Sequence, residues 1–218
     1  MQPEVRDILK DIISNEEKKL FDSVIIHYHG GGFVGMSSSS HQVYLRKWAR
    51  KLQVPVFSIE YRLAPQTKYP FVVNDAIRGY LWVITFLQSF LGCIPRKIIV
   101  TGDSAGGNLA LCVTNWCIEH GFRVPDMLQV HYPATALDTR TFSPSLLYSV
   151  EDYLLHYNVL LGILDMYLPP NSDLRRNYYI SPLATPDHIL TRYPYSEIFV
   201  CERDPLRDGG IKLASRLL

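Results

Sequence analysis

The stretch that decides the fold is KIIVTGDSAGGNLALCVTNWCIEH, Lys97 to His120. It predicts a buried, β-branched strand over 97–101 and a helix over 108–120. Between them stands GDSAG, residues 102–106, a G-x-S-x-G pentapeptide. At a strand-to-helix turn this pentapeptide holds its serine in a strained backbone, with small neighbours two positions away on each side. We therefore expect Ser104 to be a nucleophile above the sheet, the plainer alternative being a glycine-rich turn with a capping serine.

Short β-rich runs alternate with helical stretches on both sides of this turn, which predicts an α/β fold. Such an alternation is typical of a mostly parallel sheet with helices on both faces. Four further strands are predicted, at Val24–Tyr28, Val54–Glu60, Met127–Tyr132 and Ser196–Cys201. The other helices are predicted at Tyr44–Leu52, Asp75–Phe90 and Ile211–Leu218.

Residues 134–194 break the alternation and are too long for an ordinary connection. Helical pieces are predicted within them at Leu146–Leu155 and Val159–Tyr167. We expect this segment to be an insertion, or cap-like, over one end of the sheet, within a single domain spanning 1–218. Apolar residues at helical spacing predict an amphipathic helix over residues 1–20.

The charge balance and the distribution of apolar residues limit the partners and the location that we expect for this protein. The 22 basic and 21 acidic residues balance to a net charge of +1, which gives no reason to expect nucleic acid. The first twenty residues are charged throughout, unlike a signal peptide, and the apolar run around Leu81–Leu87 is too short to span a bilayer. Four cysteines without a CxxC pair predict reduced thiols. We expect a soluble, cytoplasmic protein with no transmembrane segment; peripheral contact with a lipid surface stays open.

A second motif, HGGGF at His29–Phe33, follows the first predicted strand directly. Consecutive glycines let backbone N–H groups face a ligand, and acyl transfer needs such donors for the oxyanion of its tetrahedral intermediate. The plainer alternatives are a flexible loop or a phosphate cradle, although no G-K-[S/T] follows. Two βα units separate the motifs, so both are expected at one edge of the sheet.

Four motifs occur in order: HGGGF, YRLAP at Tyr61–Pro65, GDSAGGNLA, and DPL at Asp204–Leu206 after a late strand. Together they resemble the hormone-sensitive lipase family of esterases and lipases, over roughly residues 23 to 218. The resemblance implies the α/β-hydrolase fold and hydrolysis of lipid or short-chain acyl esters through an acyl-enzyme, with no cofactor and no metal.

The same resemblance assigns roles to five residues. Ser104 attacks the ester carbonyl, and Asp204 orients a histidine. The backbone N–H groups of Gly31, Gly32 and Ala105 form the oxyanion hole. By position alone, Asp208 competes with Asp204. Candidates for the acyl pocket, with ordinary packing as the alternative, are Phe33, Met36, Tyr69, Phe142 and Tyr148.

The family's histidine follows its aspartate, yet all seven histidines of this chain precede Asp204. With the short stretch before HGGGF, this predicts a fold truncated at both ends. Three alternatives stay open: a substitute role for His156 or His188, a metal pair at His27 and His29, and a non-catalytic ligand-binding protein like the plant gibberellin receptors that resemble this family. A peptidase ranks last, because trypsin-like proteases are all-β.

Overall fold

The computed structural model describes residues 21–91, 95–139 and 143–218. In these residues five parallel strands form one sheet in the order β2-β1-β3-β4-β5. The bounds of the strands are β1 Ser23–Tyr28, β2 Val56–Ile59, β3 Lys97–Asp103, β4 Met127–His131 and β5 Tyr195–Phe199. This confirms the predicted α/β fold and parallel sheet.

One face of the sheet carries the main apolar core. The helices α3 (Phe71–Leu91) and α4 (Ala105–His120) pack against each other, and α4 also contacts β1, β3 and β4. Alternate strand residues such as Ile26 and Val100 are fully buried beneath them. Two-residue periodicity turns the intervening side chains to the other face.

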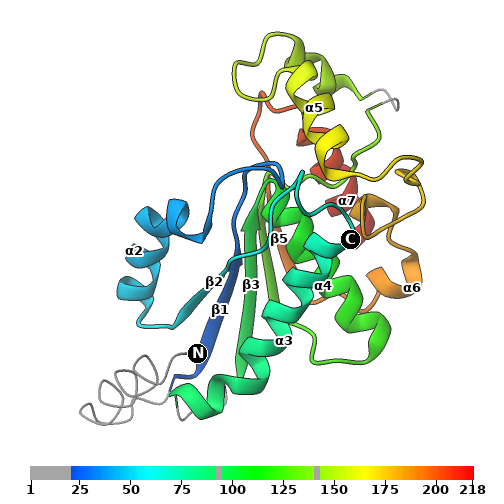
Figure 1. Ribbon diagram of the computed structural model, residues 1–218. Coiled ribbons are helices and arrows are strands. Elements are labelled where there is room, and N and C mark those ends of the chain that lie inside the picture. Colours follow the sequence, from blue (N-terminus) through cyan, green and yellow to red (C-terminus); the bar gives the residue numbers. More distant parts are fainter. Residues whose placement is uncertain (1–20, 92–94, 140–142) are drawn as a thin grey trace.

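The opposite face is covered by α2 (Gln42–Leu52), as Figure 1 shows beside the sheet. His27, next to the buried Ile26 on β1, reaches Tyr44 of α2 with a hydrogen bond of 3.0 Å. The helix α7 (Arg207–Leu217) packs on β5. Helices therefore lie on both faces, as predicted.

The first half of the segment between β4 and β5, up to the end of α5, extends beyond the carboxyl ends of the strands, and the second half returns beside α4 (Figure 1). We call residues 134–194 the insert. The insert holds η2 (Pro144–Val150), α5 (Tyr157–Tyr167), η3 (Pro182–Ala184) and α6 (Asp187–Leu190). Outside the insert, a further short 3-10 helix, η1 (Ser38–His41), precedes α2. The helix predicted over 146–155 is wrong, because only a 3-10 helix forms and it ends at Val150.

Among the described helices, none has the length and hydropathy that crossing a membrane requires. The helix predicted over residues 1–20 lies outside the described residues, as does Cys93. The other three cysteines are free thiols: Cys112 and Cys117 are buried, and Cys201 is exposed.

Candidate active site

Ser104 stands at the turn from β3 into α4 with a backbone that few non-glycine residues adopt. Its φ is 52° and its ψ is −116°. The Ser104 N–H donates to the His131 carbonyl (2.9 Å), and its carbonyl accepts from the Ala134 N–H (3.1 Å). A Cβ on Gly106 would lie 2.0 Å from the Tyr28 carbonyl oxygen, so only glycine fits there. The strained turn predicted from the pentapeptide is present.

The HGGGF segment leaves β1 and folds back beside this turn. Gly31 has φ 112°, and a Cβ there would lie 2.2 Å from the Gly35 carbonyl oxygen, so the loop needs glycine. Gly32, Phe33, Ser104 and Ala105 line one cavity, whereas Gly31 does not. The structure thus gathers most of the predicted oxyanion residues around the serine.

The YRLAP segment braces the glycine loop. The Tyr61 hydroxyl donates to the His29 carbonyl (2.6 Å), and its ring stacks on the His29 imidazole with centroids 4.1 Å apart. The Ala64 N–H donates to the Phe33 carbonyl (2.9 Å). These contacts give this motif a physical role, because they fix the backbone of the glycine loop at both of its ends.

Asp103, the residue before Ser104, links the turn to the glycine loop through hydrogen bonds of its carboxylate. Its carboxylate accepts from the Gly30 N–H (3.2 Å) and lies 3.1 Å from the His41 Nε2. Burial alone would raise the pKa of Asp103, but hydrogen bonds and charge from His27 and His41 outweigh it and lower that pKa. His41 is a residue that sequence reasoning missed, since it stands alone before a helix with no motif around it.

The metal alternative for His27 and His29 finds no support. His27 binds Ser58 and Tyr44, while the His29 Nδ1 lies 2.7 Å from the Gly30 carbonyl oxygen. Within the described ranges, no group of three or more His, Cys, Asp or Glu side chains is arranged to hold a metal ion.

The two competing aspartates differ in their hydrogen bonds. Asp208 is a structural link to the insert, because its carboxylate accepts from Ser143 Oγ (3.1 Å) and the Ser145 N–H (2.9 Å) and pairs with Arg207. The Asp204 carboxylate is buried, and among the described residues it accepts one hydrogen bond, from the Leu206 N–H (2.8 Å). Burial, opposed by that bond, raises the pKa of Asp204. Asp204 therefore keeps acceptor sites for another donor.

None of the seven imidazole side chains, all of which lie in the described ranges, forms a hydrogen bond to Ser104 or Asp204; His131 accepts from the Ser104 N–H only through its backbone carbonyl. His156 instead is the N-cap residue of α5, and its Nδ1 accepts from the Asn158 N–H (3.2 Å). His188 lies on α6, on the part of the insert that packs against α4. Neither histidine therefore makes a contact that would support its role as a substitute for the missing catalytic histidine.

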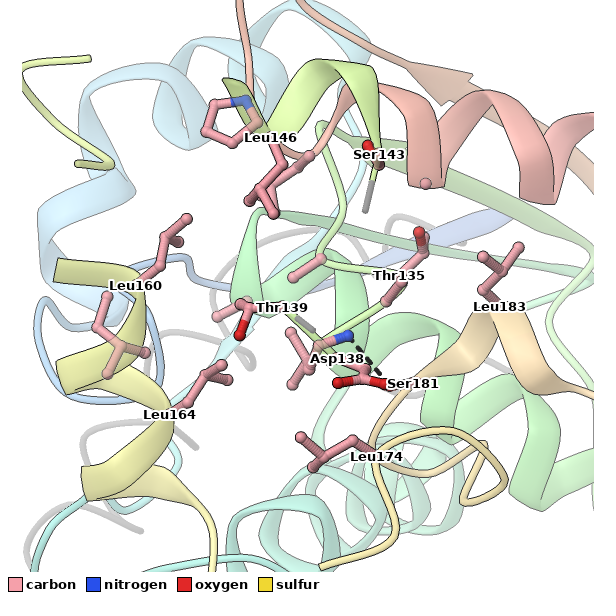
Figure 2. A pocket seen from close by; sticks show the side chains of 18 of the residues that line it. Thr135, Asp138, Thr139, Ser143, Leu146, Leu160, Leu164, Leu174, Ser181 and Leu183 are labelled. Carbon is pink, nitrogen blue, oxygen red and sulfur yellow. Dashed lines mark hydrogen bonds between the residues drawn. The ribbon is translucent and has the colours of Figure 1, made fainter. Parts of the chain in front are cut away.

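The cavity in front of Ser104 has a volume of about 300 Å³. The glycine loop and the turn line one side of it. Residues of the insert, such as Leu146, Leu160 and Leu164 in Figure 2, line the facing side, and Pro205, Leu206, Gly209 and Lys212 complete the lining. Of the 17 insert residues that line the cavity, three are alanines and eight are leucines or isoleucine: Leu137, Leu146, Leu155, Leu160, Ile163, Leu164, Leu174 and Leu183.

The acyl-pocket residues predicted from the sequence, four aromatics and Met36, are largely wrong. Phe33 does line the cavity, whereas Met36, Tyr69 and Tyr148 do not. Met36 is 59% exposed, Tyr69 is hydrogen-bonded to Asn177, and Tyr148 lies under the Arg207 guanidinium. Phe142 lies outside the described residues. The aromatics nearest in sequence are engaged elsewhere, and leucines from the insert take their place.

A strained serine between strand and helix, a glycine loop beside it and a parallel sheet beneath them define an α/β-hydrolase. A sequence profile of the alpha/beta hydrolase fold matches residues 25–218, and the chain therefore belongs to this family. It is similar to hormone-sensitive lipase of Bos taurus, with 41% identity over 145 residues, 66% of this chain and 19% of the lipase.

Two further similar proteins come from a bacterium and an archaeon. Ethyl acetate hydrolase of Pseudomonas putida is 29% identical over 203 residues, which cover 93% of this chain and 62% of that enzyme. The solved structure of a hyperthermophilic esterase from Pyrobaculum calidifontis has a TM-score of 0.85 and 32% identity, over 93% of this chain and 63% of that one. The chain thus spans less than two thirds of each of these three proteins.

Proposed function

We propose that this site hydrolyses carboxylic esters, of lipids or of short acyl chains, with Ser104 as the nucleophile. The observation that carries the proposal is that the strained serine opens into an apolar cavity whose rim is the glycine loop. Similarity to lipases and esterases supports the same chemistry. No cofactor is needed for it.

The proposed reaction has two halves. The Ser104 Oγ attacks the ester carbonyl carbon, and the N–H groups of Gly31, Gly32 and Ala105 stabilise the oxyanion. Collapse expels the alcohol and leaves an acyl-enzyme; water then attacks the acyl carbon, releases the acid and restores the serine. In the first half a base takes the serine proton and passes it to the departing alcohol; in the second half it takes a proton of the water and returns it to the Ser104 Oγ.

Asp204 is proposed to orient that base, a histidine. Three features support it over Asp208: it follows β5, it is buried, and it accepts one hydrogen bond where Asp208 accepts several. A buried carboxylate with open acceptor sites suits the Nδ1–H of an imidazole.

The remaining parts of the proposal concern the insert and the surroundings. We propose that residues 134–194 act as a cap that supplies the substrate-binding wall within one domain. The partner is a small-molecule ester or lipid, and a lipid ester would be taken from a lipid surface. The cytoplasmic location expected from the sequence belongs to this proposal.

The test is turnover of p-nitrophenyl esters of increasing acyl length. Ser104→Ala is expected to lower kcat/KM at least about 1,000-fold, because it removes the nucleophile. Ser181→Ala, which changes another serine of the cavity wall, is the matched control and is expected to stay within about tenfold. Equal rates for wild type and Ser104→Ala would refute the proposal.

A second candidate is ligand binding without turnover on the same scaffold. The observation that favours it is that, in the described ranges, no histidine side chain is hydrogen-bonded to Ser104 or Asp204. In that case a radiolabelled ester would bind reversibly and be recovered intact, and Ser104→Ala would bind it as well as the wild type does. Release of the acid at a rate that depends on Ser104 decides for the hydrolase.

A further inference from the structure

The helix α5 of the insert contacts both the cavity and the glycine loop. Leu160 and Leu164 point from α5 into the cavity (Figure 2). Ile163 and Tyr167 lie three residues beyond each of them, and both reach the HGGGF segment. Residues three and four positions apart share one face of a helix. The helix that would meet the acyl chain therefore packs directly on the loop that carries the proposed oxyanion donors.

Two contacts join α5 to the glycine loop. A Cβ on Gly32 would lie 2.8 Å from the Ile163 Cδ1, so the isoleucine packs closely on the loop backbone. Next to it, the Phe33 and Tyr167 rings stack with centroids 3.9 Å apart and an angle of 5° between their planes. Both rings are buried. The insert therefore touches the loop at a proposed oxyanion donor and at the residue that follows it.

Phe33 has a backbone conformation that needs support from its surroundings. Its φ is 64°, in the left-handed region that few non-glycine residues adopt. Such a conformation persists only where neighbouring contacts hold it. The Phe33 carbonyl accepts from the Ala64 N–H (2.9 Å), and the Phe33 ring is covered by Tyr167. Loss of the Tyr167 ring would remove one of these supports.

Tyr167 is itself held by the chain that follows YRLAP. Its carbonyl accepts from the Tyr69 N–H (2.9 Å), and the Asp165 carbonyl accepts from the Lys68 Nζ (2.9 Å). The Tyr167 hydroxyl, by contrast, is buried without a hydrogen-bond partner in the part of the chain that the structure describes. An unpaired buried hydroxyl contributes no stabilisation. The contact with the glycine loop is therefore made by the ring alone.

We propose that Tyr167 is a positioning residue for ester hydrolysis: its ring holds Phe33, and thereby the N–H groups of Gly31 and Gly32, in place for the oxyanion. The inference rests on the proposed function, because the oxyanion forms only in that reaction. An oxyanion hole acts through donors that are fixed before the reaction. A looser loop therefore lowers kcat while KM changes little, since the lost interaction is made in the transition state.

The test compares Tyr167→Leu, which removes the ring, with Tyr167→Phe, which keeps the ring and removes only the unpartnered hydroxyl. On p-nitrophenyl butyrate, Tyr167→Leu is expected to lower kcat at least about tenfold, with KM within about threefold of the wild type. The conservative Tyr167→Phe is expected to restore kcat to within about twofold. Phe33→Leu removes the same stack from the loop side, and it tests the same contact if Tyr167→Leu does not fold.

The matched control is Tyr80→Leu. Tyr80 lies on α3, is as fully buried as Tyr167 and is not part of the cavity lining; its hydroxyl donates to the Arg123 carbonyl (2.6 Å). We expect this variant to keep kcat within about twofold of the wild type at a temperature where circular dichroism shows all variants folded. A loss of kcat equal to that in Tyr167→Leu would overturn the positioning role, because any buried tyrosine would then have the same effect.

A second measurement reports on the loop without turnover. The Val34 and Gly35 N–H groups donate to the Gly31 carbonyl (3.1 and 2.9 Å), so their hydrogen exchange follows local opening of the glycine loop. Both are expected to exchange at least about tenfold faster in Tyr167→Leu than in the wild type, and at the wild-type rate in Tyr167→Phe. Unchanged exchange in a folded Tyr167→Leu would overturn the inference, whether or not the protein hydrolyses esters.

The inference and the proposed function fail separately. Serine-dependent turnover with an unchanged kcat in Tyr167→Leu, or in Phe33→Leu, would refute the positioning role and keep the hydrolase. Absent turnover in the wild type, together with loop exchange that depends on the Tyr167 ring, would refute the hydrolase and keep the hold of the insert on the glycine loop.

Discussion

The two walls of the cavity are built in different ways. On the Ser104 wall, backbone geometry decides the residue: Gly106 lies against the Tyr28 carbonyl, and Gly31 adopts a φ of 112°. On the insert wall, side chains such as Leu160 and Leu164 fill space from α5, and other apolar residues of similar size would serve. Substitutions on the Ser104 wall are therefore restricted by close backbone contacts, whereas the insert wall can keep its shape with other apolar side chains.

The largest effect is expected from Gly106→Ala on the first wall. The added Cβ would lie 2.0 Å from a backbone oxygen of β1, so the turn or the strand has to move. We expect the free energy of unfolding to fall by about 3 kcal/mol or more, with loss of any activity that depends on Ser104. Urea denaturation measures the first effect, and an unchanged midpoint would show that this wall is not built on close backbone contact.

Leu164→Ala tests the second wall. Leu164 is partly buried in the cavity lining, so we expect a cost of about 1–2 kcal/mol, below the range for a fully buried leucine. The enlarged cavity is expected to raise relative rates on longer acyl esters several-fold. Leu161→Ala, on the exposed side of the same helix, is the control. A preference that stays the same in both variants would mean that α5 does not shape the binding site.

Asp103 and Asp204 are expected to change the stability of the protein with pH in opposite directions. The pKa of Asp103 is lowered, so its stabilisation is present at neutral pH and is lost as pH falls through that lowered value. The pKa of Asp204 is raised, so its favourable state is the protonated one, which is lost as pH rises through the raised value. Thermal melts of Asp103→Asn and Asp204→Asn from pH 3 to pH 7 compare them. At neutral pH we expect the first variant to be less stable than the wild type and the second more stable.

Below the ordinary range of an aspartate pKa, the gain in Asp204→Asn is expected to vanish, because the wild-type carboxyl is then neutral as well. If Asp204→Asn were less stable than the wild type at pH 7, the ionised Asp204 carboxylate would not be destabilising, contrary to this expectation. It would mean instead that Asp204 holds the fold together, as Asp208 does.

The smallest effect is expected from Gly162→Ala in α5. A Cβ at this position meets no atom within 4 Å. Alanine in place of glycine inside a helix stabilises by roughly 0.5–1 kcal/mol. A higher urea midpoint checks this, and a lower one would show that the insert is packed as tightly as the Ser104 turn.

The same contrast explains what sequence reasoning found and what it missed. The five strands and the turn at Ser104 were predictable, because buried β-branched runs and obligatory glycines leave a pattern. Asp204 was chosen on the family resemblance, because its position after the last strand does not by itself distinguish it from Asp208. His41 was not predictable, since its partner Asp103 is 62 residues away and only the folded sheet joins them.

The lining of the cavity was the weakest prediction. Aromatics on nearby loops were chosen, but loop position does not fix where a side chain points. Met36 turns to solvent, and Tyr69 packs on Tyr167 with ring centroids 6.3 Å apart. The leucines that take their place come from a segment with no motif, because apolar volume can be supplied from many positions.

The central claim is that Ser104 is a nucleophile facing the glycine loop across an apolar cavity. The most direct measurement is mass spectrometry of the protein after exposure to an alkyl fluorophosphonate, with peptide mapping of the adduct. We predict one adduct, on Ser104, absent in Ser104→Ala and retained in Ser181→Ala. An unmodified protein, or an adduct on Ser143 or Ser181 instead, would contradict the account.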